Sequence, residues 1–164
     1  MTSLSNPFQL GDLTLSNRIV MAPMTRCRAG AGDVPTASML TYYQQRASAG
    51  LIITEATNVS PMSVPFEKAP GIYSDEQTAG WRPVADAVHA AGGRIFCQLW
   101  HGGRVGAQGL LEGRQPVAPS EVNDDLDALQ VWALLANGRY VRIAATPSRA
   151  LESAEVEEIV QQYR

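Results

Sequence analysis

Three apolar runs of strand length alternate with two helical patterns between residues 18 and 100, and this alternation constrains the fold most strongly. The runs occupy residues 18–22, 51–57 and 94–100. Between them, apolar side chains recur at helical spacing in residues 36–49 and 74–91. Because each helix returns to the next strand through a short connection, neighbouring strands should run parallel, with right-handed crossovers. The sequence therefore predicts an α/β fold.

Both helical patterns carry start and stop signals. The first follows Pro35 and stops at Gly50. The second begins after Ser74, a predicted N-cap with Gln77 as its capping-box partner, and stops at Gly92. Their apolar faces comprise Met39, Leu40, Tyr43 and Ala47 in the first helix, and Trp81, Val84, Ala85 and Val88 in the second. We expect these faces to cover the sheet.

The flanking segments follow other patterns. Residues 8–15 alternate apolar and polar side chains around Gly11-Asp12, which predicts a two-residue hairpin. Residues 106–147 form an excursion, here called the flap, in which strands at 131–136 and 139–144 flank Asn137-Gly138, a strong hairpin signal. Ser153 is the expected N-cap of a last helix that runs to Arg164. Three parallel strands leave a hydrophobic edge uncovered, which predicts a partner.

Charge and composition exclude several classes of protein. The net charge is −3 and the 13 Lys and Arg residues are scattered, so no nucleic-acid partner is expected. No apolar run approaches the length of a membrane span and no signal-peptide core opens the chain, which predicts a cytoplasmic protein without a membrane partner. Cys27, Cys97, His89 and His101 do not cluster, so we expect no metal site.

Polar and aromatic side chains gather where the three strands end. Parallel sheets place binding residues at the carboxyl ends of their strands. These ends carry residues 23–26, 55–58 and 98–101. They offer amide, hydroxyl and aromatic groups, without paired carboxylates or a nucleophile beside a base. A glutamine inside an apolar run, Gln98, should have a partner, because an unsatisfied buried amide costs about 1–3 kcal/mol. The set suits a planar heteroaromatic ligand that carries the chemistry itself.

Each of these residues also has a purely structural alternative. Gln98 would bond to strand backbone at an edge, and Thr25 would bond to backbone within its own loop. Trp100 and Phe66 would be core aromatics. His101 would be a satisfied polar residue beside a turn, and Arg104 a surface or carboxylate-pairing group.

Four motifs in this order resemble the amino-terminal portion of the Old Yellow Enzyme family of FMN-dependent ene reductases. They are residues 17–26 (NRIVMAPMTR), 42–56 (YYQQRASAGLIITEA), 69–71 (APG) and 98–104 (QLWHGGR). The resemblance covers nearly the whole chain and is weakest in the flap. It implies the amino-terminal part of a TIM (β/α)8 barrel, about three βα units within residues 1–164. It also implies FMN as cofactor, NADPH or NADH as reductant, and an activated alkene such as an enone as substrate.

The same resemblance implies roles for seven residues. Gln98 would pair with the pyrimidine edge of the flavin, since an amide offers both a donor and an acceptor. Thr25 would bond near flavin O4 and N5 and tune the reduction potential of the ring. Pro23, Met24 and Ala56 would supply backbone contacts to FMN, and Phe66 and Trp100 would line the substrate pocket.

The family's substrate-anchoring pair, proton-donating tyrosine and FMN phosphate site match positions beyond Arg164. From the sequence we therefore expect a second chain to supply the carboxyl-terminal half of the barrel, with negligible activity for this chain alone. One alternative is a truncated, non-catalytic paralogue that acts as an interaction module. Another is a flavin-dependent barrel of the dienoyl-thioester reductase kind, which would normally bring an iron–sulfur segment that this sequence lacks.

Overall fold

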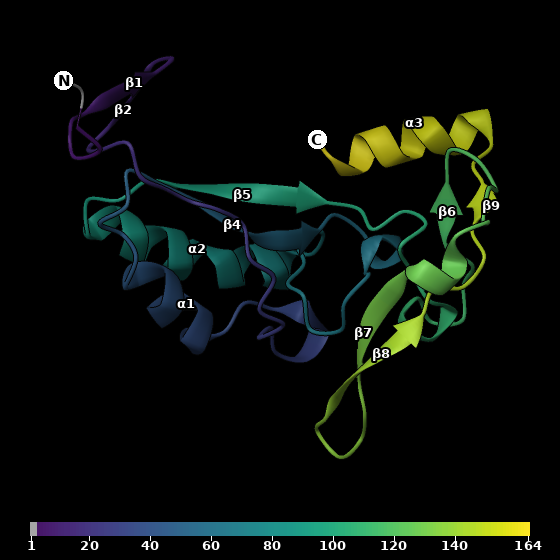
Figure 1. Cartoon of the computed structure of the whole chain (residues 1–164). Coiled ribbons are helices and arrows are strands. Elements are labelled where there is room, and N and C mark those ends of the chain that lie inside the picture. The colour runs from purple at the N-terminus through teal and green to yellow at the C-terminus, as the bar shows by residue number, and fades with distance from the viewer. Residues whose placement is uncertain (1–2) are drawn as a thin grey trace.

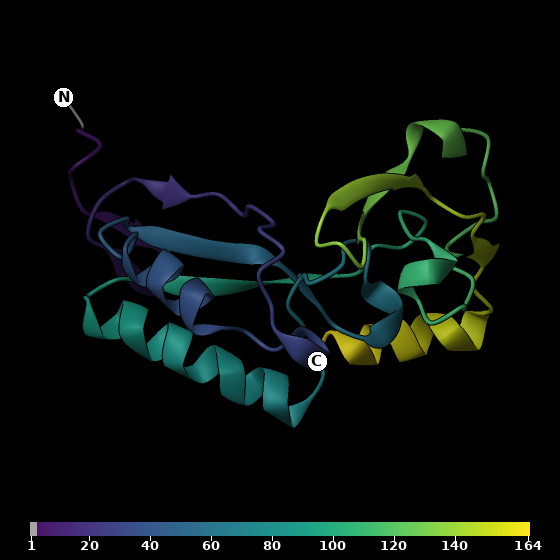
Figure 2. The ribbon, with the colours of Figure 1, turned by 90° about the horizontal axis from the view of Figure 1, so that it is seen from below.

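A three-stranded parallel sheet forms the centre of the molecule in the computed structural model, which describes residues 3–164. Its strand order is β3 (Val20–Met21), β4 (Leu51–Asn58) and β5 (Ile95–Trp100). Helices α1 (Ala37–Gln44) and α2 (Asp75–Ala90) connect the strands and lie side by side against one face (Figures 1 and 2). The predicted α/β organisation and parallel pairing are confirmed.

The core lies between the two helices and β4. Its buried members, drawn from both predicted helix faces and the central strand, include Met39, Tyr43, Ala47, Ile52, Trp81, Val84 and Val88. The predicted start of α2 is confirmed, because Ser74 Oγ accepts the Gln77 N–H at 3.2 Å and Gln77 Oε1 accepts the Ser74 N–H at 3.1 Å. Burial of these apolar side chains fixes the helices on the sheet.

The outer strands are more exposed than predicted. Ile19 and Val20, at and beside β3, expose 50% and 48% of their surface, and Phe96 and Leu99 of β5 expose 50% and 41%. Gln98 is half-buried, where the sequence predicted a buried amide. The reason is that the helices cover one face of the sheet, whereas within residues 3–164 little packs on the other. Only β4, which has a neighbour on each side, is buried along nearly its whole length.

The remaining elements flank this sheet. An antiparallel hairpin joins β1 (Phe8–Leu10) to β2 (Leu13–Leu15), with Gly11 at φ 55° in its two-residue loop. Within and after the flap, β7 (Gln130–Leu134) pairs antiparallel with β8 (Tyr140–Ala144), β6 (Val117–Ala118) pairs parallel with β9 (Arg149–Ala150), and α3 (Ser153–Gln162) follows. Short 3₁₀ turns lie at Ala31–Asp33, Pro61–Ser63, Gln108–Leu110 and Leu126–Ala128.

The β7–β8 turn is longer than the sequence predicted. The Gly138 N–H donates to Leu135 O at 2.8 Å, and the Leu135 N–H donates to Arg139 O at 2.9 Å. Gly138 takes the left-handed conformation, at φ 80°, and Asn137 does not. A two-residue Asn-Gly turn needs positive φ at both positions, so the strands separate earlier, at Leu134 and Tyr140.

The start of α3 also differs from the prediction. Glu152 is the N-cap, and Ser153 is already helical. The Glu152 N–H donates to Glu155 Oε2 at 2.8 Å. Because the carboxylate of Glu155 reaches back to this N–H, the N-cap lies one residue before the expected hydroxyl cap. In the part of the chain that the structure describes, no helix is long and apolar enough to cross a bilayer.

Candidate functional site

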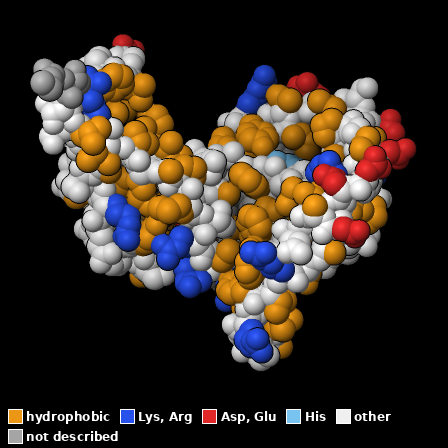
Figure 3. All heavy atoms as spheres, in the orientation of Figure 1, with side chains coloured by type: hydrophobic (Ala, Val, Ile, Leu, Met, Phe, Trp, Pro, Cys, Tyr) orange, Lys and Arg blue, Asp and Glu red, His pale blue; other side chains and the backbone are white. Residues whose placement is uncertain are grey.

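The three predicted strand ends meet at one end of the sheet, as parallel pairing requires. Ala56 of β4 and Gln98 of β5 are direct neighbours across the sheet, and Asn58 is opposite Trp100. The loop after β3 carries Thr25 to the same end. Figure 3 shows a hollow between two lobes, where hydrophobic side chains gather. The structure therefore brings together residues that lie up to 75 positions apart in the sequence.

Thr25 and Phe66 line one cavity of about 390 Å³, but the other predicted site residues do not. The lining consists of Thr25, Arg26, Cys27, Arg28, Phe66, Trp132 and Tyr140. Pro23 and Met24 are exposed on the loop before Thr25, and Met24 exposes 47% of its surface. Ala56 is buried at 3% exposure and pairs with Gln98 of the neighbouring strand β5. The structure thus joins Thr25 with Phe66 in one cavity and pairs Ala56 with Gln98 across the sheet.

Gln98 and Trp100 each have an unused polar group. The Gln98 backbone N–H donates to Thr54 Oγ1 at 2.9 Å, while its side-chain amide has no hydrogen-bond partner within residues 3–164. Trp100 Nε1 is buried and likewise has none among the described residues. His101 Nδ1 accepts the Gly103 N–H at 3.0 Å, and burial lowers the pKa of His101, which keeps the ring neutral near pH 7. Because the Gln98 side chain makes no bond to strand backbone within residues 3–164, the strand-backbone alternative for it is wrong.

The β7–β8 hairpin covers the loop after β3 and the loop after β4. Tyr140 Oη donates to Cys27 O at 3.2 Å. On the other loop, Glu67 Oε2 accepts the Leu134 N–H at 2.6 Å, and the Glu67 N–H donates to Trp132 O at 3.1 Å. Sequence analysis missed Trp132 and Tyr140, because no local pattern shows where a hairpin will dock.

A buried carboxylate, Glu55, holds the Thr25 loop in place. Glu55 is 1% exposed, and its Oε2 accepts the Arg26 N–H at 3.0 Å. Tyr43 Oη donates to Glu55 Oε1 at 3.2 Å and accepts the Glu55 N–H at 2.8 Å. Burial raises the pKa of Glu55, and the hydrogen bonds oppose that rise. Sequence analysis missed Glu55, although a carboxylate in an apolar strand is the same signal that singled out Gln98.

We expect the Cys27 thiol to react slowly with iodoacetamide. Burial raises its pKa from 9.0 to about 11, with a further contribution from the charge of Glu55. This rise lowers the thiolate fraction at pH 8 by about a hundredfold, and the thiolate is the nucleophile. The measurement compares Cys97→Ser, which keeps Cys27, with Cys27→Ser, which keeps the exposed Cys97, by mass spectrometry. Equal alkylation rates would show that the loop leaves Cys27 open to solvent.

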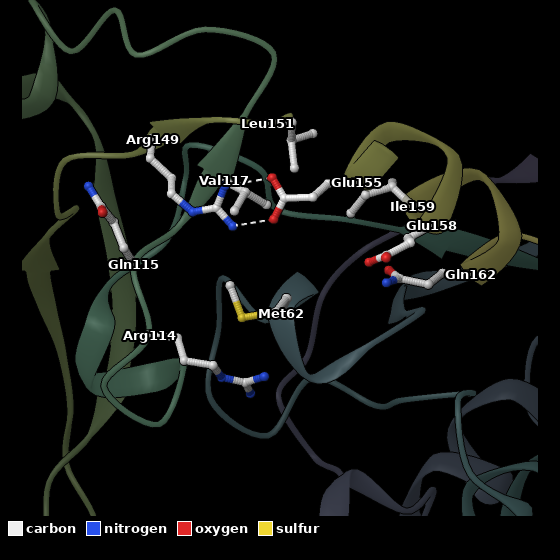
Figure 4. Close-up of a pocket in the computed structure, with 10 residues that line it drawn as sticks. All are labelled: Met62, Arg114, Gln115, Val117, Arg149, Leu151, Glu155, Glu158, Ile159 and Gln162. Atoms are coloured by element: carbon white, nitrogen blue, oxygen red, sulfur yellow. Dashed lines mark hydrogen bonds and ion pairs between the residues drawn. The ribbon is translucent and has the colours of Figure 1, made fainter. Parts of the chain in front are cut away.

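A second cavity of about 380 Å³ lies beside α3 and contains none of the predicted site residues. Figure 4 shows Arg149 and Glu155 side by side in the lining of this cavity, with bonds of 2.7 and 2.5 Å between the guanidinium and the two carboxylate oxygens. Met62, Ile159 and Leu151 supply its apolar lining. The ion pair ties the first turn of α3 to β9.

This ion pair should persist well into the acid range. The hydrogen bonds from Arg149 hold the pKa of Glu155 at about 2, below its ordinary 4.5. A lowered carboxyl pKa contributes stability that is present above pH 4.5 and is lost as the pH falls towards 2. Glu155→Gln should therefore reduce helical circular dichroism at pH 7, with the difference from wild type closing between pH 4.5 and 2. Glu158→Gln is the control, and an equal loss in both variants would contradict the role of the pair.

Comparison with known proteins yields consistent matches. The model of the NADH:flavin oxidoreductase / NADH oxidase family matches residues 3–164. The chain is 44% identical over 162 residues to 12-oxophytodienoate reductase 7 of Oryza sativa subsp. japonica, covering 98% of this chain and 40% of the relative. It is 51% identical over 117 residues to a probable flavin mononucleotide-dependent alkene reductase of Leishmania infantum, covering 71% of this chain and 32% of the relative.

Solved structures of flavin enzymes superpose closely on this chain. Morphinone reductase in complex with tetrahydroNAD superposes with a TM-score of 0.92 at 45% identity, covering 99% of this chain and 44% of the other. An old yellow enzyme homologue from Zymomonas mobilis superposes with a TM-score of 0.86 at 43% identity, covering 99% of this chain and 43% of the other. The chain thus spans about two fifths of the length of these relatives.

Proposed function

Because this chain belongs to the NADH:flavin oxidoreductase / NADH oxidase family, we propose that it forms the flavin-facing amino-terminal part of an FMN-dependent ene reductase. The observation that carries the proposal is the unused side-chain amide of Gln98 beside Ala56 at the end of the sheet. Gln98 is half-buried, and its amide is free to bind a ligand with a complementary donor and acceptor in exchange for its bonds to water. The pyrimidine edge of a flavin has both.

The residues present fit FMN on one side of its ring. Gln98 would bind the pyrimidine edge, and Thr25 would bond to the ring near O4 and N5. Pro23, Met24 and Ala56 would approach it through their backbones, and the small side chain of Ala56 leaves room. Phe66 and Trp100 would shape the substrate pocket. Bound FMN would supply hydride transfer, with NADPH or NADH as the reductant and the β-carbon of an electron-poor alkene such as an enone as the acceptor.

The rest of the site has to come from further strands of an α/β barrel. The exposed apolar side chains of β5, Phe96 and Leu99, favour the docking of such strands. An open sheet edge accepts them from the same polypeptide or from a second chain, and the proposal holds for both. We further propose that residues 1–164 form one domain of this barrel, with the flap at 106–147.

The same exposed surface favours a second candidate, a non-catalytic interaction module. Val156 and Val160 of α3 are further apolar side chains exposed to solvent, at 47% and 41%. A module of this kind would bind a barrel relative without needing flavin. The unused Gln98 amide favours the flavin role over this one.

The test is to purify the chain alone and together with a polypeptide that carries the remaining barrel strands of a relative. Flavin absorbance measures FMN binding, and NADPH or NADH oxidation with a cyclic enone measures turnover. We expect a yellow, active mixture. A stable but colourless and inactive complex would contradict the proposal and support the interaction module.

A further inference from the structure

We propose that an irregularity in β4 at Thr54 and Glu55 positions both flavin-facing groups, Thr54 through the backbone of Gln98 and Glu55 through the loop that carries Thr25. The inference rests on the proposed function and deepens it. Thr54 and Glu55 are positioning residues, because each acts through another residue that would touch the cofactor.

The irregularity is a break in the pairing of β4 with β5. Ile53 is opposite Phe96, but the next pair is Ala56 with Gln98, so β4 advances three residues while β5 advances two. Such a bulge takes one ladder hydrogen bond away and redirects side chains, and bulges are common next to active sites. Here the break falls immediately before Gln98.

Thr54 replaces the missing ladder bond. Its Oγ1 accepts the Gln98 N–H at 2.9 Å and donates its own proton to Glu55 O, also at 2.9 Å. A hydroxyl has one proton, so the bond to Glu55 O leaves a lone pair directed at Gln98. Thr54 is 2% exposed, and water does not compete for these bonds. The backbone of Gln98 is therefore held by a side chain of the central strand.

Glu55 holds the other flavin-facing group. Its carboxylate binds the N–H of Arg26, the residue directly after Thr25. Tyr43 of α1 binds both the carboxylate and the backbone N–H of Glu55, which fixes the side chain from the helix layer. Two consecutive residues of one buried strand thus reach the two neighbouring strand ends. The spacing of Thr54 and Glu55 along β4 sets the separation of Thr25 and Gln98. A rigid planar ligand would need that separation to be constant.

The experiment uses Thr54→Val, Thr54→Ser and Glu55→Gln. Valine keeps the shape of threonine but cannot accept a hydrogen bond, whereas serine keeps the hydroxyl. Glutamine keeps the length of glutamate but puts an amide donor in place of one carboxylate oxygen. The first readout, amide hydrogen exchange by NMR, needs no flavin. Thr54→Val should speed exchange of the Gln98 amide about tenfold and leave that of Arg26 unchanged, and Thr54→Ser should restore the wild-type rate. Glu55→Gln should speed exchange of the Arg26 amide and leave that of Gln98 unchanged.

The second readout is the bound flavin. Thr54→Val should weaken FMN binding about tenfold with little change in reduction potential, because it displaces Gln98. Glu55→Gln should shift the reduction potential with a smaller loss of affinity, because it displaces Thr25. Uniformly faster exchange across the sheet in both variants, with no rescue by serine, would overturn the inference. Selective exchange in the variants, together with a wild-type chain that takes up no FMN even with the remaining strands, would contradict the proposed function and leave the positioning contacts supported.

Discussion

Replacing Gln98 with alanine is expected to weaken FMN binding about ten- to a hundredfold without destabilising the protein. The side-chain amide would give the flavin one donor and one acceptor, each contributing about 0.5–1.5 kcal/mol. Within the described chain this amide has no partner to lose, and the backbone N–H stays on Thr54 Oγ1. The loss should therefore appear in cofactor affinity and not in the free energy of unfolding.

Titration of the apoprotein with FMN, followed by quenching of flavin fluorescence, measures this affinity. Gln44→Ala is the matched control, because Gln44 is an exposed glutamine at the end of α1, away from the strand ends. Thr25→Ala adds a contrast, since it should alter the reductive half-reaction more than binding. Unchanged FMN affinity in Gln98→Ala would show that the flavin site is misplaced.

Replacing Trp81 with alanine is expected to lower the free energy of unfolding by about 3–5 kcal/mol, as for other large aromatic residues in cores. Trp81 is 8% exposed, and its ring centroid lies 6.1 Å from that of Tyr43. Its Nε1 also donates to Gly71 O at 3.1 Å, so the substitution leaves a cavity and a carbonyl without its donor. This is a large part of the 5–15 kcal/mol typical of a whole domain.

Urea denaturation followed by circular dichroism gives the free energy. Trp132→Ala is the control, because this tryptophan of β7 is 37% exposed and stands over the guanidinium of Arg142. It should cost less than about 1 kcal/mol. Similar losses in the two variants would mean that the α1–α2 layer does not carry the stability of the protein.

The sequence was most informative where one local pattern decides the outcome. Helical spacing and a capping box placed α2, and the apolar run of β4 placed the buried central strand. It was less informative where two local signals compete, as at the Asn137 turn and the Ser153 cap. There the preferred residue is present, but the hairpin register and the carboxylate of Glu155 decide the conformation.

By itself, the sequence determined the α/β order of elements, the resemblance to the flavin enzymes and the strand ends where a site would form, because these depend on periodicity and short motifs. Only the tertiary structure decided which side chains act together. Thr54 looks like an ordinary strand residue, and Glu55 stands out only as an acid in an apolar run, until their partners Arg26, Tyr43 and Gln98 are in place. Their roles arise from hydrogen bonds between residues up to 44 positions apart, and no local pattern encodes such contacts.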